Sequence, residues 1–175
     1  TRFVSGYLYD PALDDAADIE VVAAGPLIAI VRVKRRIHDS ELRQDIVLRA
    51  GSRRIEFHTS IEWRENHKLL KVNFPVAVHA DEALHEIQFG HISRPTHASR
   101  LSDATQFEVC QHRWTALAEA NRGAAVLNDC KYGVNVEANS INLTLLRSPM
   151  APDASADRGL NEFTYAFYAW AGRGF

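Results

Sequence analysis

A regular alternation of apolar and polar residues constrains the fold of this chain more than any other feature of its sequence. Between positions 54 and 63, one set of alternate side chains is apolar or a threonine, and the other set is charged or polar. The first set is Ile55, Phe57, Thr59, Ile61 and Trp63, and the second is Arg54, Glu56, His58, Ser60 and Glu62. Because successive side chains of a β-strand point to opposite faces, this pattern predicts a strand with one buried face.

The same two-residue period recurs along the chain and predicts an all-β protein. Alternating or β-branched segments cover residues 19–24, 27–37, 70–78, 141–146 and 163–167. About ten strand candidates follow one another at short spacing, with turn residues between them. Such spacing is typical of antiparallel sandwiches and barrels, so we expect a single β-sandwich domain over residues 1–175.

One segment has a helical composition. Residues 114–120 read Trp-Thr-Ala-Leu-Ala-Glu-Ala, and Ala, Leu and Glu are strong helix formers. Asn121, Arg122 and Gly123 would end such a helix after about two turns. We therefore expect one short helix at Trp114–Ala120. No glycine-rich nucleotide-binding motif occurs, and no alternation of helices with strands suggests a parallel sheet.

The composition excludes several classes of protein. The 175 residues are 46% hydrophobic and 24% charged, which argues against a disordered chain. A net charge of -2 argues against a nucleic acid or an anionic membrane as partner, and no apolar run approaches about 18 residues. Cys110 and Cys130 do not make a disulfide framework and suggest a reducing compartment; a small buried thiol is the expected state of each.

Two stretches lack the strand pattern. Asp10–Asp18 is acidic and rich in alanine, and predicts a solvated loop. Ser148–Asn161 contains two prolines and a glycine, and predicts a long excursion between two strands; such loops usually serve as a lid or a partner contact, or are disordered. The start Thr1-Arg2-Phe3 carries no signal-like sequence and fits either a piece of a longer protein or a trimmed complete one.

Candidate metal and nucleophile sites are weak. His85, His91 and His97 are six residues apart, or about 20 Å along a strand, whereas one metal ion needs ligands about 2 Å away. Surface or hydrogen-bonded histidines are therefore the favoured interpretation, unless the chain folds back at Gly90 and Pro95. No metal-binding or nucleophile-elbow motif occurs, and no carboxylate pair stands out as a glycosidase pair. We expect no cofactor in this chain.

The segment with the richest chemistry is Asn128-Asp129-Cys130-Lys131-Tyr132-Gly133. It combines an amide, a carboxylate, an ammonium and a phenol, which can hydrogen-bond a hydroxylated ligand. A polar hairpin turn with Gly133 at positive φ would explain the same residues, and the residues alone favour that interpretation. Arg147, at the end of the alternating segment 141–146, is a second candidate, although a strand-end arginine is usually a surface or ion-paired residue.

Several longer strings resemble one known family. They are Phe89–His97, Phe107–Cys110, His112–Trp114, Leu127–Gly133, Leu145–Pro149 and Glu162–Ala166, together with His67–Val72 and Phe74–Val76. In this order they resemble the C-terminal β region of glycoside hydrolase family 38 α-mannosidases, closest to the bacterial and cytosolic-type members. The resemblance extends from about Gly25 to Tyr168.

The resemblance implies a β-supersandwich like that of galactose mutarotases, packed against a catalytic barrel and a helical domain of the same polypeptide. In this family a retaining mechanism uses an aspartate nucleophile and a divalent ion, usually zinc, that holds mannose hydroxyls. Those groups belong to the catalytic part, so none carries over to this chain. The chain would then be a non-catalytic domain of a cytoplasmic enzyme that hydrolyses terminal α-mannosides, supporting the barrel and forming part of the cleft wall. A homo-oligomer is compatible with this interpretation.

The resemblance also suggests site residues. An arginine of the β region approaches the active site in such enzymes, and Arg147 fits that position. The side chains of Asn128, Asp129, Lys131 and Tyr132 would line the same cleft. The position of Arg147 is in step with apolar residues of its strand, so its guanidinium must leave the core at the strand end.

Two other functions stay open from the sequence. A self-contained aldose epimerase would use His91 or His97 with Glu86 or Glu108 for proton transfer. A free-standing carbohydrate-binding module would expose aromatic platforms, for which Trp114 and Trp170 are available while Trp63 falls in a core stripe.

Overall fold

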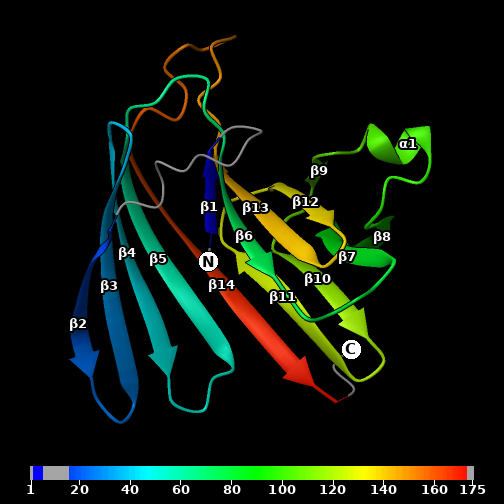
Figure 1. Ribbon diagram of the computed structural model, residues 1–175, viewed down its shortest axis with the longest axis horizontal. Coiled ribbons are helices and arrows are strands. Elements are labelled where there is room, and N and C mark those ends of the chain that lie inside the picture. The colour runs from blue at the N-terminus through cyan, green and yellow to red at the C-terminus, as the bar shows by residue number, and fades with distance from the viewer. Residues whose placement is uncertain (1, 6–15, 173–175) are drawn as a thin grey trace.

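The computed structural model describes residues 2–5 and 16–172, which form two packed antiparallel sheets (Figure 1). The five-stranded sheet has the order β1 (Arg2–Ser5), β6 (Leu70–Pro75), β13 (Ser140–Leu146), β12 (Gly133–Glu137) and β9 (Val109–Cys110). The nine-stranded sheet has the order β2 (Asp18–Ala24), β3 (Ile28–Ile37), β4 (Ser40–Arg49), β5 (Arg54–Trp63), β14 (Gly159–Ala171), β11 (Arg122–Asn128), β10 (Trp114–Glu119), β7 (Glu82–Ile87) and β8 (Gly90–Pro95). The predicted antiparallel, nearly all-β architecture is confirmed.

The strands follow the alternation of the sequence. The segment predicted from positions 54–63 is β5, which pairs along its whole length with β14, from Trp63 opposite Gly159 to Arg54 opposite Tyr168. The predicted loop Asp10–Asp18 lies mostly outside the described residues, and its last residue begins β2. No helix in the described ranges is long and apolar enough to cross a bilayer.

The core lies between the two sheets and is built from the predicted apolar stripes. Trp63, Leu70, Val72 and Ile141 are fully buried there. In its centre the rings of Phe57 and Tyr165 stack with centroids 5.0 Å apart. Burial raises the pKa of the Tyr165 phenol, whose oxygen accepts a hydrogen bond of 2.8 Å from the Gln44 side-chain amide.

The helix predicted at Trp114–Ala120 is wrong. These residues form β10, which lies between β11 and β7 and pairs with both. Ala116 and Leu117 are fully buried on opposite faces of that strand, so burial in the sheet outweighs the helix propensity of the segment. The helix that the structure does contain is one turn, α1 (Leu101–Ala104), which follows β8.

The predicted excursion between two strands is confirmed, although its last residues belong to β14. It begins after β13 and ends at Gly159. The carboxylate of Asp157 accepts the backbone N–H groups of Arg147 and Ser148, at 2.8 and 3.1 Å. The Trp63 indole donates a hydrogen bond to the Ser148 hydroxyl, so the excursion is fixed against the core.

The two sheets differ in width, with five strands against nine, and nearly all side chains of the edge strand β2 are exposed. Strands β2 to β4 lie at one side of the molecule, and β5 is drawn between them and the strands of the narrower sheet (Figure 1). On the core-facing side of β2, Ile19 and Val21 are each 66% exposed. On the opposite face of the same strands, Arg32 and Asp45 form a bidentate ion pair at 2.7 and 2.8 Å.

Candidate functional site

A cleft on the outer face of the nine-stranded sheet is a candidate site, with a volume of about 300 Å³. Volumes of this order are at the lower end of small-ligand sites. Its lining residues are Arg54, Glu56, Arg113, Trp114, Leu127, Asn128, Asp129, Thr164, Tyr165 and Ala166. The set combines two cations, two carboxylates and an apolar wall.

The register of four neighbouring strands explains the hollow. Glu56 of β5 lies opposite Ala166 of β14, Ala166 lies opposite Leu127 of β11, and Leu127 lies opposite Trp114 of β10. These four side chains form one row across the outer face. Because Ala166 contributes only a methyl group, the row is hollow between Glu56 on one side and the apolar pair on the other.

Glu56 is a fixed negative charge in this cleft. Its carboxylate lies 2.5 Å from the Arg54 guanidinium, 3.1 Å from His58 Nε2 and 3.7 Å from Arg49 Nε. Burial favours the protonated form, but the hydrogen bonds from His58 and Arg54 outweigh it and hold the pKa of Glu56 below its ordinary value. Glu56 is therefore ionised at neutral pH and does not serve as a proton donor there.

Asn128 and Asp129 both line this cleft, and both are held in place. The Asp129 carboxylate accepts the Thr164 backbone N–H at 2.9 Å, and the Asp129 N–H donates to the Thr164 carbonyl at 3.2 Å. Asn128 donates its amide to the His112 carbonyl at 3.1 Å and accepts the Lys131 N–H at 2.7 Å. Their backbone is thus fixed to β14 and to the β9–β10 connection.

The segment after Asn128 is not the hairpin turn that the residues alone favoured. It connects β11 of the nine-stranded sheet with β12 of the five-stranded sheet, so the chain crosses here between the layers. Gly133 does not have positive φ. A Cβ at this position would lie 3.1 Å from Thr144 Cβ and 2.9 Å from a Glu108 carboxylate oxygen, so close approach, rather than backbone conformation, favours glycine.

Lys131 and Tyr132 lie beside the cleft wall rather than in it. The Lys131 ammonium is 4.4 Å from the centroid of the Phe163 ring, in a cation–π contact. Tyr132 is 54% exposed, and its ring packs edge-on against His112, with centroids 5.6 Å apart. Both side chains are therefore close to the Asn128–Asp129 wall but have partners of their own.

The expectation of buried thiols is wrong, because Cys110 and Cys130 are both exposed free cysteines. Partial burial and the neighbouring Asp129 carboxylate raise the pKa of the Cys130 thiol. A thiol with a raised pKa is a weaker nucleophile at neutral pH, so neither burial nor reactivity gives Cys130 an evident role.

Arg147 leaves the core as predicted. A register irregularity in β13 between Thr144 and Leu146 turns both Leu145 and Leu146 inward, at 3% and 2% exposure. Arg147 is exposed just after them and is anchored through its backbone to Asp157. Arg147 does not line the cleft that Asn128 and Asp129 line.

Sequence reasoning missed most of the residues that line the cleft. Arg54, Glu56, Arg113 and Thr164 all line it, and each is an outward polar residue of an alternating strand or its end. Such residues resemble any solvated strand face, and only the pairing register places them together. Of the two candidate aromatic platforms, Trp114 lines the cleft, whereas Trp170 is only 8% exposed.

The candidate histidines for catalysis or metal binding lie apart. His91 lies opposite Glu86 in the β7–β8 hairpin, but the Glu86 carboxylate accepts the Arg113 N–H at 2.6 Å. Glu108 forms an ion pair with Lys71 on the other sheet. His97 is exposed after β8. Residues 2–5 and 16–172 contain no group of three or more His, Cys, Asp or Glu residues that could hold a metal ion.

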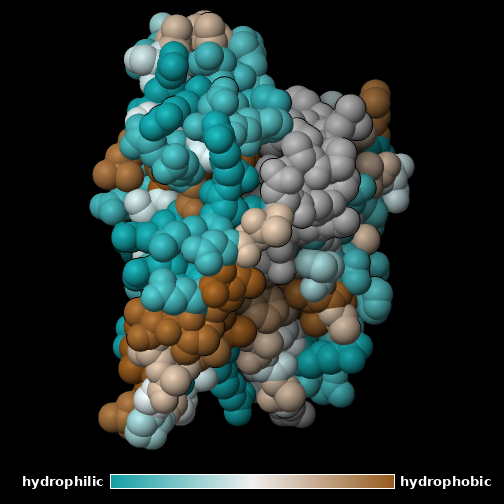
Figure 2. Space-filling model, turned by 60° about the vertical axis from the view of Figure 1, so that its left-hand side comes forward, coloured by the Kyte–Doolittle hydropathy of each residue, from teal (hydrophilic) through white to brown (hydrophobic). Residues whose placement is uncertain are grey.

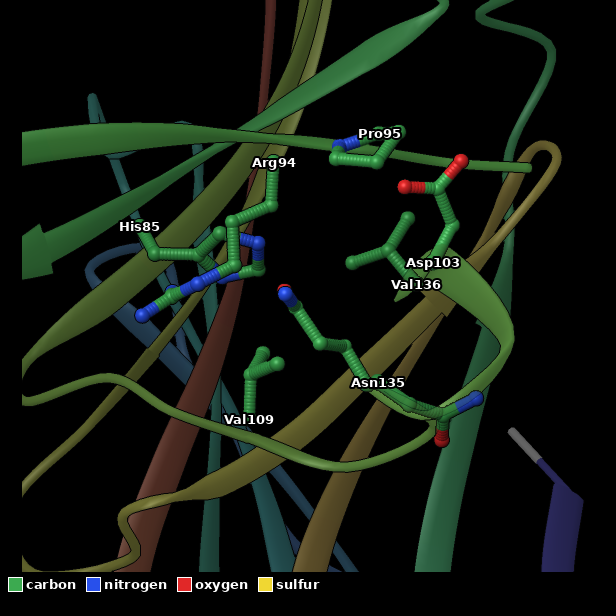
Figure 3. Close-up of a pocket in the computed structure, with 8 residues that line it drawn as sticks. His85, Arg94, Pro95, Asp103, Val109, Asn135 and Val136 are labelled. Atoms are coloured by element: carbon green, nitrogen blue, oxygen red, sulfur yellow. The ribbon is translucent and has the colours of Figure 1, made fainter. Parts of the chain in front are cut away.

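His85 is buried beside a second, much smaller cavity of about 30 Å³ (Figure 3). His85 and Arg94 lie close together on one side of it, and Asp103 of α1 lies on the other (Figure 3). Burial, reinforced by the Arg94 charge, lowers the pKa of His85 to about 4, and its Nδ1 lies 3.0 Å from the Thr115 hydroxyl. The cavity has room for roughly two water molecules and is too small for a sugar.

Comparison with known families decides the classification. Residues 3–155 match the C-terminal domain of glycosyl hydrolases family 38. The chain belongs to this family. This agrees with the family resemblance of the sequence segments between Gly25 and Tyr168.

Similar proteins place the family 38 domain within longer chains. The chain is 46% identical over 157 residues to human "Alpha-mannosidase 2C1", a match that covers 89% of this chain and 15% of that protein. A solved α-mannosidase from Enterococcus faecalis V583 superposes with a TM-score of 0.81 at 16% identity, covering 91% of this chain and 23% of the other. A putative aldose 1-epimerase from Klebsiella pneumoniae matches at a TM-score of 0.50 and 12% identity, over 89% of this chain and 54% of the other, which shows a shared fold.

Proposed function

We propose that this chain is the non-catalytic C-terminal β domain of a cytoplasmic α-mannosidase that hydrolyses terminal α-D-mannosides with retention of configuration. The match to the family 38 C-terminal domain over residues 3–155 carries the proposal. Residues 1–175 form one domain, and the catalytic barrel and helical domain belong to other parts of the same polypeptide. The share of 15% of the human relative's length leaves ample chain for them.

The chemistry of the described residues favours a structural role in the longer enzyme rather than catalysis of hydrolysis. Retaining hydrolysis needs one carboxylic acid that donates a proton and a second carboxylate about 5 Å away as nucleophile. Glu56, the buried carboxylate of the cleft, is held ionised by its cationic neighbours. The divalent ion, zinc by resemblance, does not fit the described residues of this chain, which contain no ligand cluster for it. No step of the reaction is therefore assigned to a metal here.

In this proposal, the domain lends two groups of residues to carbohydrate binding. Trp114 offers an apolar face and Asp129 an anchored carboxylate to a sugar in the outer cleft, with Asn128, Lys131 and Tyr132 around them. Arg147 contributes a planar guanidinium that can bind two hydroxyls or a carboxylate of the catalytic cleft. The exposed, unpaired Cys110 and Cys130 support a reducing compartment such as the cytoplasm.

The first test is hydrolysis of an aryl α-mannoside by the longer polypeptide and by the 175-residue chain. We expect turnover by the longer polypeptide and none by this chain, with or without added zinc or cobalt. Metal-dependent turnover by the 175-residue chain would contradict the non-catalytic role. Absence of turnover by the longer polypeptide on any α-mannoside would contradict the proposed activity.

The second test is Arg147→Lys in the longer polypeptide, with Arg158→Lys on the same surface excursion as the matched control. Lysine keeps the charge but loses the planar fork, so we expect kcat/KM to fall about tenfold or more, or roughly 1.4 kcal/mol of transition-state binding. The control should change kcat/KM less than twofold, and neither change should move the melting temperature. A loss of stability with unchanged activity would make Arg147 a structural residue.

A further inference from the structure

One carboxylate holds the start of the excursion between β13 and β14. The Asp157 side chain accepts the backbone N–H of Arg147 at 2.8 Å and that of Ser148 at 3.1 Å, both through Oδ2. Successive backbone N–H groups that converge on one oxygen form a small anion-binding concavity, and hydrogen bonds to a carboxylate are stronger than those to a neutral acceptor. Asp157 therefore fixes the backbone at the residue that carries the Arg147 side chain.

The backbone at this end of the sandwich has unfavourable dihedral angles. Six non-glycine residues in the described part of the chain have positive φ, and three of them are linked by hydrogen bonds here: His67 (53°), Ser148 (44°) and Asp157 (65°). The His67 N–H donates to the Ser148 carbonyl at 3.1 Å, and the Ser148 N–H donates to Asp157. Such conformations persist only where the surroundings enforce them, and they cluster at functional sites. The strain therefore points to a function for this turn.

The base of the excursion is fixed from several sides. Ser148 is only 2% exposed, and its hydroxyl accepts a hydrogen bond from the Trp63 indole. The Asp157 carbonyl in turn accepts the Asn161 side-chain amide at 2.8 Å. Both partners of the contact between Asp157 and Ser148 are thus held by other strands of the sandwich, so the contact joins two rigid points.

The Arg147 side chain, in contrast, is exposed and available to a ligand. Within residues 2–5 and 16–172, no acceptor binds its guanidinium. The excursion rises above the strands at the upper end of Figure 1, and the described surface at that end is mostly hydrophilic in Figure 2. An unpaired guanidinium on a rigid base is the arrangement expected of a preorganised binding group.

We propose that Asp157 is a positioning residue of the mannosidase, which fixes the backbone at Arg147 so that the guanidinium is directed at the substrate. The inference rests on the proposed function, in which Arg147 binds hydroxyls or a carboxylate of the catalytic cleft. Preorganisation lowers the entropy lost on binding, and a misplacement of about 1 Å can cost about 100-fold in rate. Asp157 needs no contact with the sugar, because it acts through Arg147.

A purely structural role in the loop is the alternative, and the same excursion offers a matched control. Asp153 accepts the Ser155 backbone N–H at 2.8 Å and the Ser155 hydroxyl at 2.7 Å. These contacts are local, whereas Asp157 binds a backbone N–H ten residues earlier in the chain. Asp153→Ala therefore removes a carboxylate that holds the excursion without holding Arg147.

Amide hydrogen exchange in the 175-residue chain, followed by NMR, tests the contact itself. Asp157→Ala should speed exchange of the Arg147 and Ser148 amides about tenfold or more, because both lose their acceptor. Asp153→Ala should change exchange at these two amides less than about twofold. Unchanged exchange at Arg147 and Ser148 in Asp157→Ala would overturn the proposal.

A double-mutant cycle in the longer polypeptide tests the positioning role. Asp157→Ala should lower kcat/KM for an aryl α-mannoside about fivefold or more, but less than about twofold in the Arg147→Ala background, where the group to be positioned is gone. Equal losses in both backgrounds would overturn the proposal, since Asp157 would then act by another route. Asp157→Asn keeps one acceptor oxygen and should give a smaller loss with the same dependence on Arg147, so it replaces the alanine variant if that variant unfolds.

Failure of the inference can be distinguished from failure of the proposed function. Absence of turnover by the unmodified polypeptide would contradict the proposed function, and the exchange rates of the 175-residue chain would still decide whether Asp157 fixes the backbone at Arg147. Full activity of Arg147→Ala would overturn the inference while the mannosidase activity stands. The control Asp153→Ala should keep kcat/KM within about twofold of its starting value in both backgrounds.

Discussion

Ile61 and Ile19 have the same residue type and lie on the same face of one sheet, yet their surroundings are opposite. Ile61 of β5 is fully buried beneath the five-stranded sheet, whereas Ile19 of β2 is 66% exposed. β5 has a partner strand on each side, whereas β2 is the edge strand and pairs with β3 alone. Ile61 belongs to the core cluster between the two sheets, and Ile19 does not.

Two properties of a strand face must be distinguished: which side chains belong to it, and whether another layer covers it. Alternation specifies which side chains share a face, because the side-chain period of a strand is two. It does not specify whether that face has a cover, since the cover comes from residues distant in sequence. In the described chain, the cover of β5 is provided by β6 and β13, and that of β2 is not.

The largest expected effect is at Ile61, in the core between the two sheets. Ile61→Ala should lower the free energy of unfolding by about 2–5 kcal/mol, because it removes buried methyl groups and leaves a cavity in a packed core. Urea denaturation of the 175-residue chain at pH 7 measures it. Ile61→Val is the conservative control and should cost about 0.5–1.5 kcal/mol. A cost of Ile61→Ala below that of the control would show that the core is loosely packed there.

The buried His85 should make the stability of the chain depend on pH. Its pKa is lowered from 6.5 to about 4, so the unfolded chain binds a proton at this residue between those pH values and the folded chain does not. Stability from this residue is therefore present above pH 6.5 and is lost as the pH falls toward 4. Since one pKa unit corresponds to about 1.4 kcal/mol, the loss is at most about 3 kcal/mol.

The measurement is urea denaturation between pH 7 and pH 4 for the wild type and for His85→Gln. The variant should lose less stability on acidification, because glutamine has no proton to take up and still reaches the Thr115 hydroxyl. His97→Gln, at an exposed histidine, is the control and should follow the wild-type profile. Parallel profiles for all three proteins would show that His85 is not buried as described.

Much of the fold was predictable because alternation is local. The alternation at 54–63, 70–78 and 141–146 predicts strands, and the structure has β5, β6 (Leu70–Pro75) and β13 (Ser140–Leu146) there. The helix expected at Trp114–Ala120 fails for a non-local reason. Ala, Leu and Glu favour a helix in isolation, but pairing with β11 and β7 buries both faces of this segment. The short α1 has no strong signal in the sequence.

The candidate site was predictable only in part. Asn128 and Asp129 are recognisable by their chemistry, because several different polar groups stand together in sequence. Glu56, Arg113 and Thr164 come from separate strands, and only the register of β5, β14, β11 and β10 brings them to one cleft. Register follows from the fit of the whole sheet, so no local pattern reports it.

Gly123 of β11 packs closely against the Trp170 ring on the outer face of the nine-stranded sheet. A Cβ at this position would lie 2.0 Å from the Trp170 ring, which covers the glycine from the neighbouring strand. Gly123→Ala should therefore destabilise the chain by about 1–3 kcal/mol, although alanine in a strand is otherwise favourable. Thermal unfolding measures it. Gly90→Ala is the control, because a Cβ there meets nothing within 4 Å, and it should change stability by less than about 0.5 kcal/mol.

The smallest expected effect returns to the opening comparison. Ile19→Ala in the 175-residue chain should change the free energy of unfolding by less than about 0.5 kcal/mol, because Ile19 is 66% exposed and its removal leaves no cavity. Urea denaturation of the 175-residue chain makes the measurement, with Ile61→Ala as the comparison. A cost of Ile19→Ala close to that of Ile61→Ala would contradict the exposed position of Ile19.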